Sequence, residues 1–178
     1  MYFKKLIGRK CYLSPIDIND AEIYTEWLND QEVVKYLPLN HFALSLNNEK
    51  DFLQTLVKDH NYAIIDLETN QLIGNIGINN YDGIYQSGEI GIFIGNKEYW
   101  NKGYGTEAMR LLTAYCFDIL NLHSITLCTH AANRRAIKCY EKIGFKKAGE
   151  YRDRILINQK YENLILMDLL LQDFIRQE

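Results

Sequence analysis

The chain reads GNKEYWNKGYGTEA over residues 95–108, and this stretch decides the fold. An alternating apolar run at 88–94 precedes it, and an amphipathic helical pattern follows it. The predicted order is therefore strand, glycine turn and helix. Free N–H groups and the positive dipole end at the start of such a helix form a site for an anion. Gly103 and Gly105 lack the Cβ that would keep a phosphate away from the backbone.

The spacing of these glycines excludes two common nucleotide motifs. It matches neither G-x-x-x-x-G-K-[ST] nor G-x-G-x-x-G, so ATP and dinucleotides lose their main support. Lys102 adds a positive charge to the same loop. Taken alone, the loop is explained about as well by an ordinary tight turn.

A second motif, NRRAIKCYEKIGF, occupies residues 133–145. Asn133 is a good helix N-cap, and Gly144 is a good residue just past the helix end. The helix has one apolar stripe, formed by Ala136, Ile137, Tyr140 and Ile143. Tyr140 therefore points inward. A core tyrosine with one hydrogen bond accounts for it when this motif is considered alone.

The first half of the chain predicts helices followed by an antiparallel meander. Asn19 and Glu22 form a capping-box pattern that opens one helix, and Ser45 is the expected cap of another. Three extended runs follow, at residues 62–67, 72–78 and 88–94.

The second half alternates strand and helix, which implies at least partly parallel pairing. The helix after the glycine turn carries an expected apolar stripe of Ala108, Leu111, Leu112, Tyr115 and Ile119. A strand at 125–128, a helix at 133–142 and a strand from Phe145 come next. Residues 164–175 fit a helix by their leucine content and a strand by the turn at 158–160 before them. The sequence leaves both open.

Composition excludes several classes of protein. The chain has 178 residues, of which 47% are hydrophobic and 24% charged, with a net charge of −3. This balance is typical of a globular protein, and it lacks the positive field that nucleic-acid binding requires. No apolar run is long enough to span a bilayer, and no secretory signal is found. The four cysteines have no metal-binding or redox spacing. We therefore expect a cytoplasmic protein with no metal.

The two motifs together resemble motifs A and B of the GCN5-related N-acetyltransferase (GNAT) superfamily. The family's [QR]-x-x-G-x-[GA] loop is matched by residues 100–105, with Trp100 in place of Gln or Arg. Its second motif is matched by Asn133, Ala136 and residues 140–145. Two linked motifs at the expected separation are far more specific than either one.

The resemblance covers nearly the whole chain. Residues 117–123 and 149–153 look like the branch of ribosomal-protein alanine acetyltransferases and spermidine acetyltransferases. The resemblance implies one GNAT domain over residues 1–178, of the α+β (mixed α/β) class. In that fold a central, mostly antiparallel twisted sheet contains a splayed parallel strand pair and is flanked by helices. The resemblance does not decide whether the protein is a monomer or a homo-oligomer.

The resemblance also implies acetyl-coenzyme A as the acetyl donor. Its pyrophosphate would lie on the loop formed by Trp100, Asn101, Lys102, Gly103, Tyr104, Gly105 and Thr106. Its pantetheine arm would pair like an added strand with the backbone of Phe93, Ile94 and Gly95. The far side of the donor would be lined by Asn133, Arg134, Arg135 and Ala136.

The implied chemistry is direct transfer of the acetyl group from a thioester to a primary amine. Tyr140 matches the family's usual tyrosine acid, which protonates the departing thiolate. Glu89 is our candidate for the base, or for the carboxylate that orders a water chain. A solvated strand residue explains Glu89 equally well. No Cys-His or Ser-His arrangement argues for a covalent acyl-enzyme.

The acceptor is the open question. Few carboxylates occur around Asp30, Glu32 and residues 37–41, which disfavours a polycation such as spermidine. A protein amino terminus, an amino acid, an amino sugar or another small amine stays possible. Two alternatives from other classes are a non-catalytic acyl-CoA sensor and an interaction domain that uses exposed aromatic residues. Retention of Tyr140 favours the enzyme.

Overall fold

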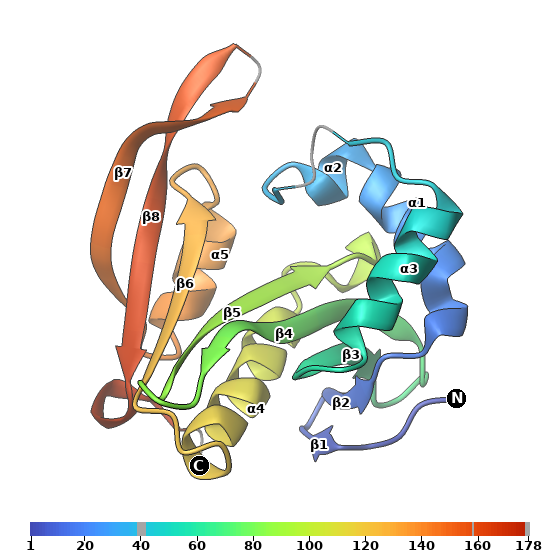
Figure 1. The fold of residues 1–178 in the computed structure, drawn as a ribbon, viewed down its shortest axis with the longest axis horizontal. Coiled ribbons are helices and arrows are strands. Elements are labelled where there is room, and N and C mark those ends of the chain that lie inside the picture. The colour runs from blue at the N-terminus through green and yellow to red at the C-terminus, as the bar shows by residue number, and fades with distance from the viewer. Residues whose placement is uncertain (39–41, 158, 177–178) are drawn as a thin grey trace.

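In a computed structural model of the chain, residues 1–38, 42–157 and 159–176 are described. Within them, eight strands form one sheet in the order β1-β2-β3-β4-β5-β6-β8-β7 (Figure 1). The strands are β1 (Leu6–Ile7), β2 (Cys11–Pro15), β3 (Asn61–Asp66), β4 (Leu72–Asp82), β5 (Ser87–Ile94), β6 (Ser124–His130), β7 (Lys146–Ile157) and β8 (Lys160–Leu170). Neighbouring strands are antiparallel except β5 and β6, which are parallel.

The parallel pair is short and opens into a V. Its register runs only from Ser87–Ser124 to Glu89–Thr126. Beyond Glu89, β5 stays paired with β4, whereas β6 stays paired with β8. Figure 1 shows the two halves of the sheet parting from the point where β5 and β6 meet. The predicted mixed fold with a splayed parallel pair is confirmed.

The described residues form five α-helices. They are α1 (Ala21–Asn29), α2 (Gln31–Val34), α3 (Leu46–Leu56), α4 (Tyr104–Asp118) and α5 (Arg134–Glu141). Helices α1 and α3 pack on one face of β2 and β3, whereas α4 covers the opposite face (Figure 1). Helix α5 packs on the β6–β8 part of the sheet. None of the described helices is long and apolar enough to cross a membrane.

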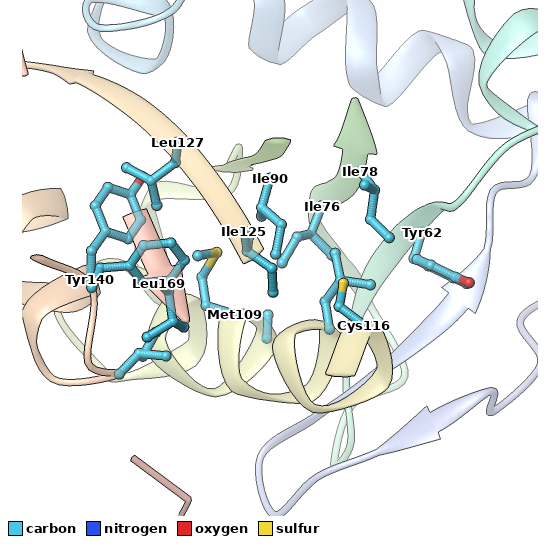
Figure 2. Close-up of a cluster of buried hydrophobic side chains, with 14 of the residues drawn as sticks. Tyr62, Ile76, Ile78, Ile90, Met109, Cys116, Ile125, Leu127, Tyr140 and Leu169 are labelled. Atoms are coloured by element: carbon cyan, nitrogen blue, oxygen red, sulfur yellow. The ribbon is translucent and has the colours of Figure 1, made fainter. Parts of the chain in front are cut away.

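The larger core cluster joins the two halves of the sheet. Met109 and Cys116 on α4 lie beneath Ile76 from β4 and Ile125 from β6 (Figure 2). All four side chains are fully buried. Tyr140 belongs to the same cluster, as its place on the apolar stripe predicts. The core therefore holds β5 and β6 together below the point where they diverge.

Two predictions about helices are wrong. Asn19 is not the cap of α1; its backbone N–H donates to Asp17 Oδ1 at 3.0 Å, which caps a short 3₁₀ turn before the helix. Ile119 is 62% exposed and does not belong to the buried stripe of α4. The helix ends at Asp118, so the helical period no longer governs the next side chain.

The tail is a strand for most of its length. Residues 164–170 belong to β8, and a 3₁₀ turn at Leu171–Asp173 follows. The Ile175 N–H then donates to the Ile143 carbonyl at 2.9 Å, which ties the tail to the end of α5. Of the predicted turn at 158–160, residue 158 lies outside the described residues, as do residues 39–41 on the acceptor side.

Candidate active site

A cleft of about 850 Å³ lies where β5 and β6 diverge. Its walls are β5, the loop to α4 and the first turn of α4, helix α5, the end of β6, and α2 with the segment after it. Of the residues predicted from the sequence, those lining it are Glu89, Phe93, Ile94, Trp100, Asn101, Gly103, Gly105, Thr106, Asn133, Arg134, Arg135, Ala136 and Tyr140. The two motifs, 30 or so positions apart in the chain, thus meet at one site.

Three predicted residues lie outside this lining. The Gly95 N–H donates to a β4 carbonyl at 2.9 Å. The Tyr104 hydroxyl donates to Asp66 Oδ1 at 2.8 Å, and the Lys102 carbonyl accepts from Lys10 Nζ at 3.1 Å. These contacts hold the outer side of the glycine loop against β3 and the segment before β2.

The start of α4 has the geometry of an anion site. Its N-cap is Gly103, at φ +89°, which has no side chain to bond the amides of the first turn. A Cβ added at Gly105 would have only Ile94 Cγ1 near it, at 3.8 Å. The backbone is therefore open on the cleft side, as close approach of a phosphate requires.

The charge of the cleft differs from that of the whole chain. The chain carries a net charge of −3, yet the charged residues lining the cleft are mainly basic: Lys35, Arg134, Arg135, Lys138 and Lys142 against Glu32 and Glu89. Four of the five basic residues come from α5 and the residue after it. This concentration of positive charge favours a ligand with several negative charges.

Trp100 connects the glycine loop to both walls. Its indole Nε1–H donates to the Ile94 carbonyl at 2.7 Å. The Arg135 guanidinium lies over its ring, 4.2 Å from the centroid. One backbone acceptor at the end of β5 is therefore already used by the protein itself.

Tyr140 places a phenol in a nearly dry environment. Its side chain is 8% exposed, and its ring lies 6.0 Å from that of Phe145. In Figure 2 its hydroxyl points toward Leu127 on β6. Among the described residues, this hydroxyl has no hydrogen-bond partner. Burial raises the pKa of Tyr140 well above its usual 10, so the phenol stays protonated.

Glu89 lies at the last register position of the parallel pair. Its carboxylate accepts from Asn80 Nδ2 at 3.1 Å and from Cys128 Sγ at 3.6 Å. Burial, and then the charge of Glu89, raise the pKa of the Cys128 thiol. Because the thiolate is the nucleophilic form, this cysteine is poorly suited to carry an acyl group.

On the side of the cleft opposite the glycine loop, Glu32, Leu37 and Pro38 line it, as the expected acceptor region suggests. Sequence reasoning missed their neighbours. Tyr36, which follows α2, lines the cleft, and its ring packs edge-on against His130 with centroids 5.5 Å apart. Cys128 and Thr129 line it from β6. The strand predicted at 125–128 contains Cys128, but its nearness to Glu89 depends on the register that sets Thr126 opposite Glu89. The sequence holds no comparable signal for Tyr36.

A splayed parallel pair, an open glycine loop, a basic helix and a buried phenol meet in one cleft. Comparison with known proteins identifies the family. The protein-family model described as "Acetyltransferase (GNAT) domain" matches residues 10–146, so the chain belongs to the GNAT acetyltransferases. The resemblance stated from the two motifs is confirmed.

Named relatives agree with this assignment. The chain is 28% identical to "Uncharacterized N-acetyltransferase p20" of Bacillus licheniformis, over 98% of this chain and 97% of that protein. It is 28% identical to "Putative ribosomal N-acetyltransferase YdaF" of Bacillus subtilis, over 89% and 90%. Its fold is similar to that of the Vibrio cholerae spermidine N-acetyltransferase solved with CoA and spermine, with TM-score 0.82, 22% identity and coverage of 93% and 98%.

Proposed function

We propose that the protein transfers an acetyl group from acetyl-coenzyme A to the primary amine of a small molecule or a protein amino terminus. The observation that carries this proposal is the meeting of the open glycine loop, the basic helix α5 and Tyr140 in one cleft. The four cysteines are unpaired, in keeping with the reducing cytoplasm that we expect.

The donor end of the cleft fits coenzyme A. The uncapped amides of α4 would hold the pyrophosphate, and the basic side chains Arg134, Arg135 and Lys138 would balance its charge. From residue 90 onward, β5 has no β6 partner in register, so the pantetheine arm would run along this edge. The related V. cholerae structure was solved with CoA, which supports the same donor here.

The chain's own groups supply proton transfer at two points. When bound, acetyl-coenzyme A supplies a thioester, an activated acyl group. Glu89 accepts the proton that the attacking amine must lose, directly or through water, because an alkylammonium with a pKa of about 10.4 is not nucleophilic. Once the amine nitrogen has bonded to the acyl carbon, the carbon–sulfur bond breaks and the Tyr140 hydroxyl donates its proton to the departing sulfur. The second proton that the nitrogen loses passes through water and restores the phenol.

The acceptor side favours a monoamine over a polyamine. Lys97 Nζ lies 2.8 Å from Asp30 and 3.0 Å from Glu32, so one ammonium group offsets one of their two negative charges. Lys35 adds a positive charge to the same wall. Among the described residues that line the cleft, Glu89 is then the one carboxylate without a cationic partner. A single carboxylate matches a single ammonium group.

The test is a panel of amines incubated with acetyl-coenzyme A while released thiol is measured. The panel includes simple monoamines, amino acids, amino sugars, spermidine and a peptide with a free amino terminus, with the acetyl-blocked peptide as control. We expect thiol release and an acetylated product with at least one monoamine. Preference for spermidine would contradict the monoamine assignment. Binding of coenzyme A without amine-dependent release would favour a sensor.

A further inference from the structure

One aromatic ring joins three elements at the donor end of the cleft. The Trp100 indole N–H bonds to the last residue of β5, while the face of the ring contacts Arg135 in the first turn of α5. Trp100 itself belongs to the loop before α4. Both side chains line the cleft. Because the indole is held by a hydrogen bond at its edge, its face has a fixed direction.

This contact orders an arginine without using up its donors. A free arginine side chain loses about 2 kcal/mol of conformational entropy when it is fixed. Stacking on an indole uses the face of the guanidinium and leaves its N–H groups free at the rim. Among the described residues, Arg135 has no ion pair and no side-chain hydrogen bond. Its donors are therefore available to an anion in the cleft.

We propose that Trp100 is a positioning residue that holds Arg135 in place to bind a phosphate of the acetyl donor. The inference rests on the proposed function, since it assumes coenzyme A as the ligand. Trp100 acts through Arg135 and makes no side-chain contact of its own with the phosphate. The aromatic residue at the first position of the loop would thus raise donor affinity through an ionic contact made by another element.

The salt dependence of binding separates this role from simple packing. An ionic contact weakens as salt rises, whereas packing does not. We expect Arg135→Gln to weaken coenzyme A binding about tenfold at low salt and to reduce its salt dependence. Trp100→Leu should reduce the salt dependence to the same extent although it removes no charge. The double variant should then show no further reduction.

The measurement is calorimetric titration with coenzyme A at several salt concentrations. Arg154→Gln, on β7 and outside the cleft, is the matched control and should keep the wild-type salt dependence. Trp100→Phe keeps an aromatic ring and should retain most of the salt dependence of coenzyme A binding. Trp100→Leu with the wild-type salt dependence, or Arg135→Gln with wild-type binding, would overturn this inference but not the proposed function. Wild-type protein that binds no coenzyme A would overturn the proposed function as well.

A spectroscopic measurement covers the case in which Trp100→Leu does not fold. The chain has two tryptophans, so Trp27→Phe leaves Trp100 as the sole indole. Its emission should change when Arg135 is replaced by Gln and when coenzyme A is added. Emission unaffected by either change would refute the coupling between the two side chains.

Discussion

Replacing Tyr140 by Phe tests the proposed acid most directly, because the structure separates its chemical and structural roles. Phe keeps the ring, which is buried in the core cluster beside Phe145. The lost hydroxyl has no partner among the described residues, so the free energy of unfolding should change by no more than about 1 kcal/mol. A positioned acid contributes roughly 10²–10⁴-fold to the rate, which is about 2.7–5.5 kcal/mol of barrier.

We therefore expect Tyr140→Phe to lower kcat by roughly 10²–10⁴-fold while its affinity for coenzyme A stays the same. Thiol release on the best amine measures the first quantity, and calorimetry measures the second. Tyr62→Phe is a suitable control, because Tyr62 is equally buried in the same cluster but lies outside the cleft. Its kcat should match that of the wild type. A Tyr140→Phe enzyme with wild-type kcat would refute the acid role and leave the donor site untouched.

Three further variants probe the loop, the base and a buried carboxyl. Gly105→Val should fold, because its Cβ meets only Ile94 at 3.8 Å. It should weaken coenzyme A binding at least tenfold, because the side chain fills the phosphate site. Unchanged affinity by calorimetry would remove the loop from the site. Glu89→Gln should lower kcat/KM, and a variant with the wild-type kcat/KM would assign the base elsewhere. Burial raises the pKa of Glu49 to about 7. The folded state thus binds the extra proton between about pH 4.5 and 7, and stability falls as pH rises through that window. Glu49→Gln should remove this fall, worth at most about 3 kcal/mol, in urea denaturation at pH 5 and 8; a pH dependence like that of the wild type would contradict it.

The donor end of the site could be predicted from the sequence because its signals are local. Gly103 needs a positive φ, and Asn133 accepts from the Ala136 N–H at 3.2 Å, as an N-cap does. Each requirement is met within a few residues, so the spacing alone reveals it. The resemblance to a known family then brought the two segments together.

The contacts that build the acceptor side could not be predicted, because they join distant segments of the chain. Tyr36 meets His130 across the cleft, and Lys97 pairs with two carboxylates near α2. Neither contact has a spacing signature. The misplaced cap at Asn19 has a different cause. In a capping box the Asn19 N–H would bond to Glu22, but here it donates to Asp17 and forms a tighter turn.

The strand order β6-β8-β7 has a consequence for biosynthesis. Strand β8, which pairs with one edge of β6, is made after β7. That edge of β6 therefore stays unpaired while roughly 40 residues are added. At roughly 5–20 residues per second, that interval lasts about 2–8 s. Ile125 and Leu127 make this strand apolar, and an open apolar edge is a template for aggregation. A chain truncated after Ile157 would carry the glycine loop, the basic helix and the tyrosine, yet it would lack β8 and leave this edge of β6 unpaired.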